Sequence, residues 1–165
     1  MFEAIEWPDD MKPSRSPIHF TNELEVPVRP ETIWSLLTDT AAWPDFYPGV
    51  AKVDLLDGHK TLRLGTRFET NLAGQDVLAS VDEFKPVTRI AWSGGPKSSP
   101  TSRAYHAWII TPTSQGTHLW TEETMQGPLW LELAKPAPDI FWRTHEQLLA
   151  DLSRVAIARE ALNAA

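Results

Sequence analysis

Short segments that alternate apolar and polar residues follow one another through most of this chain. In 18–28 the even positions are mostly apolar and the odd positions mostly polar, which is the pattern of a strand with one buried face. Six further strands, separated by turn residues, are predicted at 50–56, 62–72, 75–84, 88–93, 103–111 and 117–126. The last segment, 137–163, instead repeats apolar residues at helical spacing. This order predicts an α+β fold, with a curved antiparallel sheet of seven strands and the helices collected on one side.

One or two short helices are expected between the first two strands. Pro30 suits the first turn of a helix, whose apolar stripe includes Ile33 and Leu37. Residues 42–47 fit either a second short helix or a tight loop. No repeat or linker divides 18–163, so a single domain is predicted there.

Residues 1–17 precede this domain as an arm that contains several prolines and acidic residues. The arm either stays loosely held or docks through Phe2 and Trp7. It has no apolar stretch of the kind that a secretory signal contains, and a cytoplasmic location is therefore expected.

Composition argues against several classes of function. Fifteen basic and twenty-two acidic residues give a net charge of −7, whereas proteins that bind nucleic acid need a basic face. Without cysteine the chain has no disulfide, no thiolate nucleophile and no cysteine-ligated zinc or iron–sulfur site. No apolar run exceeds five residues, far short of the ~20 that a membrane span needs.

Turn lengths predict which side chains share a face of the sheet, because directly opposite residues in an antiparallel pair have a constant sum of residue numbers. A two-residue turn after position 72 places Phe68 opposite Ala79, and the last hairpin places His106 opposite Glu123. The apolar side chains assigned to one shared face are Phe68, Leu72, Val77, Val81, Ile90, Trp92, Trp108, Ile110, Leu119 and Met125.

Four polar side chains are assigned to the same face, namely Glu83, His106, Thr121 and Glu123. For Glu83 the assignment follows from placing Phe84 opposite Arg89 in the middle hairpin, which sets Val81 opposite Trp92 and Glu83 opposite Ile90. Buried polar groups need partners, since an unpaired buried charge is costly or is neutralised. His106 and Glu123 are therefore predicted to pair across their strands.

His106 and Glu123 form the candidate catalytic pair. A histidine titrates near neutral pH and can move a proton, while a carboxylate can hold its tautomer. Alternatively, the two residues form a cross-strand hydrogen bond that only sets the register. His145 follows Phe141 by four residues, so it either faces the sheet or is a satisfied core residue.

Aromatic and polar side chains near this face are candidate ligand contacts, with ordinary core packing as the alternative. Small-molecule pockets are mostly apolar and use a few polar groups to fix orientation. Trp43 and Tyr47 are placed at the mouth of the predicted pocket. The other candidate contacts are Phe68, Trp92, Trp108, Thr121, Met125, Phe141 and His145. The histidines show neither HxH nor HExxH spacing, and no phosphate or dinucleotide loop occurs, so no metal or cofactor is expected.

Several stretches of the sequence, taken together in this order, resemble a known family. They are LEVPVRPETIWSLLTDTAAWPDFYPGV (24–50), GTRFET (65–70), VDEFKPVTRIAWSGG (81–95), HAWII (106–110) and GTHLWTEETMQGPLW (116–130), followed by the closing helix. Over 18–158 the chain resembles the birch-pollen-allergen-like, START-type superfamily (SRPBCC), close to its polyketide cyclase/dehydrase branch. This resemblance implies a helix-grip fold, in which a seven-stranded sheet wraps the final helix around an apolar cavity. Members of the superfamily carry lipids, sterols or plant hormones, or they cyclise, dehydrate or aromatise polyketides, and they share no invariant catalytic set.

Three functions remain open at this point. The first is binding of a hydrophobic small molecule, such as a lipid, a sterol or an aromatic polyketide-like compound, between the sheet and the final helix. The second is a cyclase or dehydrase in which His106 takes a proton and Glu123 orients it, and the third is an interaction module with a filled core. The expected partner is a hydrophobic small molecule, with no nucleic acid, no integral membrane association, and a monomeric or homodimeric state.

Overall fold

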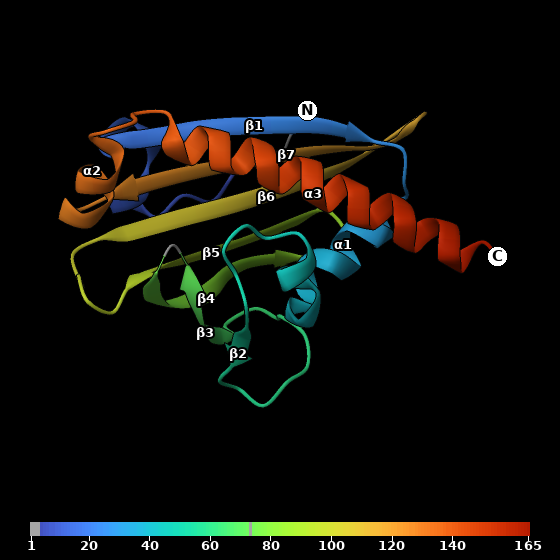
Figure 1. Ribbon diagram of the computed structural model, residues 1–165, viewed down its shortest axis with the longest axis horizontal. Helices are drawn as coiled ribbons and strands as arrows, with labels where there is room; N and C mark the ends of the chain where they lie inside the picture. The colour runs from blue at the N-terminus through green and yellow to red at the C-terminus, as the bar shows by residue number, and fades with distance from the viewer. Residues whose placement is uncertain (1–3, 73) are drawn as a thin grey trace.

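The computed structural model describes residues 4–72 and 74–165, and within them seven strands form one antiparallel sheet (Figure 1). The strands are β1 (Ile18–Val26), β2 (Val53–Leu55), β3 (Arg67–Leu72), β4 (Gln75–Lys85), β5 (Arg89–Pro96), β6 (Arg103–Thr113) and β7 (Gly116–Gln126). Their order in the sheet is β1-β7-β6-β5-β4-β3-β2, so consecutive strands pair from β2 onward and β7 closes against β1. The predicted seven-stranded antiparallel sheet is confirmed.

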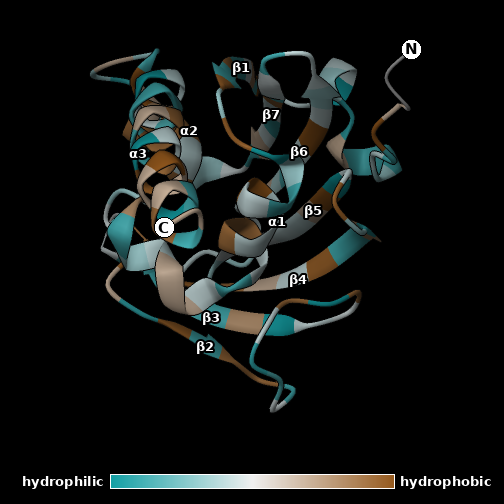
Figure 2. Cartoon of the chain, turned by 90° about the vertical axis from the view of Figure 1, so that its right-hand side faces the viewer, coloured by the Kyte–Doolittle hydropathy of each residue, from teal (hydrophilic) through white to brown (hydrophobic). Residues whose placement is uncertain are grey.

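The α-helices of the described residues lie on one side of this sheet (Figure 2). Helix α1 (Pro30–Thr38) and the 3-10 helix η3 (Thr40–Asp45) follow β1, α2 (Pro128–Ala134) follows β7, and α3 (Ile140–Asn163) closes the chain. The predicted closing helix is confirmed. For residues 42–47, where a short helix and a tight loop were both open, the structure has the short helix η3. Helix α2 had not been predicted. Among the residues described, no helix is long and apolar enough to cross a membrane.

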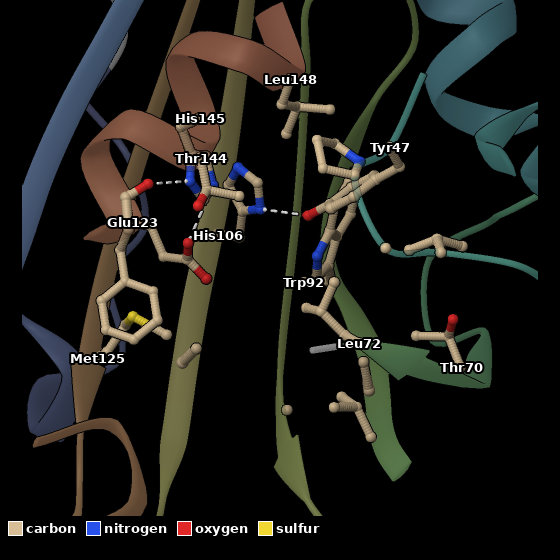
Figure 3. A pocket seen from close by; sticks show the side chains of 18 of the residues that line it. Tyr47, Thr70, Leu72, Trp92, His106, Glu123, Met125, Thr144, His145 and Leu148 are labelled. Atoms are coloured by element: carbon tan, nitrogen blue, oxygen red, sulfur yellow. Dashed lines mark hydrogen bonds and ion pairs between the residues drawn. The ribbon is translucent and has the colours of Figure 1, made fainter. Parts of the chain in front are cut away.

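The main core lies between the sheet and the two packed helices α1 and α3. Helix α3 buries Leu148, Leu152 and Ala156, which recur at the four-residue spacing of one helical face. Helix α1 adds Ile33 and Leu36, both fully buried. Toward the start of α3 this layer does not close against the sheet, and a pocket remains there (Figure 3).

Two of the three predicted hairpin registers are confirmed in full. Phe68 pairs with Ala79, and His106 pairs with Glu123. The alternation of each strand therefore gives the correct inner face in β3, β6 and β7.

The middle hairpin differs from the prediction at one point. Val81 pairs with Trp92 as expected, but a bulge between Val81 and Glu83 shifts the register. Glu83 therefore pairs with Ala91 instead of Ile90, and Phe84 pairs with Ile90 instead of Arg89. The prediction that Glu83 shares the inner face is therefore wrong. A bulge adds one unpaired residue and reverses the facing of those beyond it, without a change in composition that the pattern could show.

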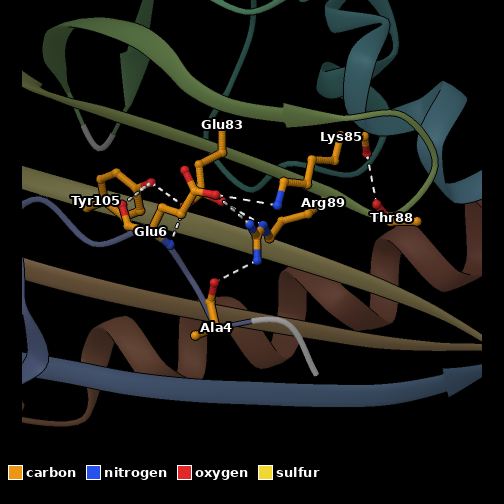
Figure 4. A network of polar contacts seen from close by, with 7 residues as sticks. All are labelled: Ala4, Glu6, Glu83, Lys85, Thr88, Arg89 and Tyr105. Atoms are coloured by element: carbon orange, nitrogen blue, oxygen red, sulfur yellow. Dashed lines mark hydrogen bonds and ion pairs between the residues drawn. The ribbon is translucent and has the colours of Figure 1, made fainter. Parts of the chain in front are cut away.

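Outward-facing Glu83 takes part in a buried ion pair (Figure 4). Its Oε2 lies 2.6 Å from Nε of Arg89, and the two side chains are only 3% and 4% exposed. Glu83 Oε1 accepts hydrogen bonds from the Tyr105 hydroxyl at 2.7 Å and from the Glu6 backbone N–H at 2.8 Å. Arg89 in turn donates to the Ala4 carbonyl oxygen at 2.7 Å.

The described part of the N-terminal arm, residues 4–17, thus covers the face of the sheet opposite the α-helices. Its segments η1 (Asp9–Met11) and η2 (Pro13–Arg15) are single 3-10 turns, and Met11 is fully buried. Trp7 packs against Tyr105 with ring centroids 5.1 Å apart. Of the two residues expected to dock the arm, Trp7 does so, and Phe2 lies outside the described residues.

Candidate functional site

The pocket lies between the helix-covered face of the sheet and the first turns of α3, and its volume is about 380 Å³ (Figure 3). The predicted contacts that line it are Trp43, Tyr47, Phe68, Trp92, Met125, Phe141 and His145, together with His106 and Glu123. Two predicted contacts, Trp108 and Thr121, are not part of its lining. Both instead contact His106, Trp108 through its ring at 4.8 Å between centroids and Thr121 through its hydroxyl.

Small residues on the strands leave the space that the pocket occupies. Ala79, Gly94, Gly95 and Ala104 all line it, where larger side chains would fill it. Gly94 has no alternative, because a Cβ there would lie 2.3 Å from the Leu78 carbonyl oxygen. Strand β5 consequently runs on through both glycines to Pro96, where a loop had been predicted from residue 94.

Aromatic side chains after α1 form one wall. Trp43 is held by its Nε1–H, which donates to the Leu37 carbonyl oxygen at 3.1 Å. Its ring stacks on Tyr47 at 5.1 Å and lies 5.2 Å from Trp92. This packing directs the Tyr47 hydroxyl toward His106, whose Nδ1 lies 3.3 Å away. Burial raises the pKa of Tyr47, and the charge of Glu123 adds to that rise, so the phenol stays protonated.

His106 is held in one tautomer by its neighbours. The Thr121 hydroxyl donates to the Ala107 carbonyl oxygen at 3.0 Å, which leaves its oxygen to accept from His106 Nε2 at 2.6 Å. Nε2 therefore carries the proton, and Nδ1 keeps a lone pair toward Tyr47. Burial lowers the pKa of His106 to about 3, although Glu123 opposes that shift and His145 adds to it. The ring is neutral near pH 7.

The carboxylate of Glu123 contacts His145 on α3. Its Oε2 lies 3.0 Å from Nε2 of His145. The other nitrogen of that ring, Nδ1, lies 2.9 Å from the Phe141 carbonyl oxygen, which can only accept, so Nδ1 carries a proton. Burial raises the pKa of Glu123, but the interactions with His106 and His145 outweigh it and the net shift is downward. His106 and Glu123 face each other across their strands as predicted, yet in the described structure the hydrogen bonds of His106 go to Thr121 and Tyr47.

The polar wall of the pocket is therefore a cluster of His106, Glu123 and His145, one residue each from β6, β7 and α3 (Figure 3). One side-chain ligand atom from each lies within 4.8 Å of the other two, and all three residues are buried. Sequence reasoning named the three residues separately but missed the contact between Glu123 and His145. It also missed the bond from Tyr47 to His106, because no short-range pattern relates a loop residue to a strand 59 positions away.

The sheet, the long closing helix and the pocket between them define a helix-grip domain. The chain belongs to the family described as "Polyketide cyclase / dehydrase and lipid transport", which matches residues 17–156. This confirms the resemblance drawn from the sequence. No match is found among curated proteins.

Solved structures share the fold at low sequence identity. The hypothetical protein jhp0584 from Helicobacter pylori is 24% identical with a TM-score of 0.85, and the match covers 94% of this chain and 98% of that one. DynU16, from the dynemicin biosynthetic locus, is 15% identical with a TM-score of 0.60, covering 89% of this chain and 47% of its own. Ara h 8.0201 is 13% identical with a TM-score of 0.63, covering 86% and 98%.

Proposed function

We propose that this protein binds a compact, ring-containing hydrophobic molecule that carries a neutral polar group. The observation that supports the proposal is the pocket of about 380 Å³, whose walls are largely aromatic and aliphatic with one polar cluster. Pockets that bind small molecules combine these two features. The same cavity argues against the third alternative, an interaction module with a filled core.

The size of the pocket favours a small ring system. Its volume of about 380 Å³ corresponds to roughly a dozen water molecules at ~30 Å³ each. A molecule of two or three fused rings fits this space better than a sterol or a long acyl chain. Flat rings also suit walls formed by Trp43, Phe68 and Trp92, since aromatic groups pack favourably at offset or edge-on angles.

The charges around the pocket favour a neutral ligand. Among the described residues, no lysine or arginine lines it, and Glu123 contributes a carboxylate. A ligand carboxylate would meet this charge in a poorly solvated site without a cation to pair with. A phenol or an enol, by contrast, can donate a hydrogen bond to the Glu123 carboxylate.

Tryptophan fluorescence tests the proposal, because Trp43 and Trp92 line the pocket. The purified chain would be titrated with 2-naphthol and with the carboxylate 2-naphthoate, which share one ring system. We expect saturable quenching by 2-naphthol and at least tenfold weaker binding of 2-naphthoate. Mass spectrometry of molecules retained from a mixed panel of phenols, fatty acids and sterols then identifies the preferred class.

A pair of alanine replacements controls for binding outside the pocket. Ala104→Phe places a ring where Ala104 lines the cavity, whereas Ala150→Phe adds the same ring on the exposed side of α3. The first variant should lose binding and the second should retain it. Equal binding by both variants, or no binding by the wild-type chain, would refute the proposal.

A second candidate is proton transfer of the cyclase or dehydrase kind. The contact between Glu123 and His145 favours it, because one proton held there could pass to a hydroxyl group that leaves as water. His106 would then accept a proton from carbon through Nδ1, with its orientation set by Thr121 instead of Glu123. Loss of water from a bound β-hydroxy ketone, abolished in His106→Gln while naphthol binding persists, would support this activity. A β-hydroxy ketone recovered unchanged from the wild-type chain would exclude it.

A further inference from the structure

The cluster of His106, Glu123 and His145 has a chemistry that apolar ligand binding does not require. Two imidazoles and one carboxylate from three separate elements converge on one wall of the pocket. One ligand atom from each lies within 4.8 Å of the others. Among the described residues, no other group of histidine and acidic side chains comes together in this way.

Both histidines are held in tautomers that leave one ring nitrogen without a proton. His145 donates through Nδ1 to the Phe141 carbonyl oxygen, and His106 donates through Nε2 to the Thr121 hydroxyl. Histidines that bind metals make this kind of bond, in which the N–H opposite the metal is fixed by a carbonyl or another acceptor. The remaining nitrogens are His145 Nε2 and His106 Nδ1. The Tyr47 hydroxyl lies 3.3 Å from the latter, so an ion bound there replaces this contact.

The contact between Glu123 and His145 is incomplete without a positive charge between them. His145 is 7% exposed, and its Nε2 makes no hydrogen bond within the described structure. It lies 3.0 Å from Oε2 of Glu123. A neutral imidazole would direct its lone pair at an ionised carboxylate, which is repulsive. Either a proton or a metal ion must therefore lie at this contact.

We propose that His106, Glu123 and His145 form a binding site for a divalent transition-metal ion of the zinc type, with an open coordination position toward the pocket. Two nitrogen donors and one carboxylate oxygen suit zinc, which commonly binds three protein ligands and leaves a fourth position free. Calcium and magnesium prefer oxygen donors and are disfavoured here. Zinc bonds of roughly 2.0–2.2 Å place tetrahedral ligand atoms roughly 3.4 Å apart, so the widest separation must close by about 1.4 Å.

The sequence had indicated no metal, because its histidines lack the spacings of contiguous metal motifs. Such spacings identify only ligands that lie on the same helix or the same strand. Here the ligands lie on β6, β7 and α3, and only the fold brings them together.

Metal titration of the whole chain tests the inference. The protein is treated with a chelator, dialysed and titrated with ZnCl₂ by calorimetry, and with CoCl₂ as a spectroscopic probe. We expect one ion per chain, a visible absorption of tetrahedral Co²⁺, and a higher Tm on saturation because the ion binds the folded state. Glu123→Gln should weaken binding at least 100-fold.

The neighbouring residue provides a matched control. Glu122 points to the opposite side of β7 and contacts His19 at 2.7 Å, an exposed histidine–carboxylate pair without a third ligand among the described residues. Glu122→Gln should bind zinc like the wild-type chain. His145→Asn provides a second ligand variant, should Glu123→Gln fail to fold, and should lose the Co²⁺ absorption. Binding is overturned if the wild-type chain takes up no ion, or if Glu122→Gln loses the uptake that the ligand variants retain.

This inference can fail separately from the proposed function. Quenching by 2-naphthol is measured in the presence of a chelator and does not depend on metal. Naphthol binding without metal uptake would refute only the metal site, and metal uptake without naphthol binding would refute only the proposed ligand class.

Discussion

Replacing Arg89 by methionine would remove one half of the buried ion pair that joins the sheet to the N-terminal arm. Methionine keeps much of the length of the side chain but removes its charge and its hydrogen bonds. Glu83 would stay 3% exposed with its main cationic partner gone. Breaking a buried pair in this way costs more than the pair contributes, because the remaining charge stays buried without compensation.

The magnitude follows from the contacts that remain. Removal of one partner from a buried ion pair typically costs roughly 3–5 kcal/mol. Glu83 would keep the hydrogen bonds from the Tyr105 hydroxyl and the Glu6 N–H, at 2.7 and 2.8 Å. We therefore expect the lower end, about 3 kcal/mol. For a domain of this size, that loss lowers Tm by roughly 6–12 °C.

Urea unfolding measures this loss of stability, and two further variants test whether it comes from the unpaired charge of Glu83. Glu83→Gln combined with Arg89→Met removes both charges, while the side-chain amide oxygen introduced at position 83 can still accept both hydrogen bonds, so this double variant should recover at least half of the lost stability. Arg103→Met breaks another pair between sheet and arm, Arg103 with Asp10, which is 42% and 58% exposed and should cost less than about 1 kcal/mol. If Arg89→Met cost no more than Arg103→Met, or if the double variant were no more stable than Arg89→Met, the reasoning would be wrong.

Two further predictions concern the tyrosines and the glycines. Burial raises the pKa of both Tyr47 and Tyr105 above the ordinary value of 10.0, aided at Tyr105 by its bond to Glu83. The unfolded chain therefore loses these protons at lower pH than the folded chain, and the free energy of unfolding should fall as the pH rises beyond about 10. Phenolate absorbance should appear only as the chain unfolds. Phenolate absorbance in folded protein at pH 10 would contradict the burial of these tyrosines. Gly127→Ala should lower the free energy of unfolding several times as much as Gly58→Ala in the same urea assay. Both glycines have positive φ, so the backbone cost is shared. Only at Gly127 would a Cβ also lie 2.4 Å from the backbone of Ser102. Equal losses would refute the close approach.

Much of the architecture was predictable because it depends on local patterns. The alternation in 18–28 marks a strand with one buried face, and the constant residue sum placed Phe68 opposite Ala79 and His106 opposite Glu123. In an antiparallel hairpin, the turn length alone determines these pairs. The order of the stretches also identified the family correctly.

The errors arise where a local pattern has no information about a distant partner. The bulge at Asp82 leaves composition unchanged and sends Glu83 to the outer face, where the arm covers it. Helix α2 is short, and its seven residues carry too little periodicity to stand out.

The amino-acid sequence by itself determined the strands, most of their facing and the residue types available to the pocket. These properties follow from side-chain alternation and turn geometry, which act over a few residues. The tertiary structure alone decided that Glu123 meets His145 and that His106 meets Tyr47 and Thr121. The reason is that such contacts depend on where α3 and the loop after η3 settle on the sheet, and the packing of the whole core sets that position.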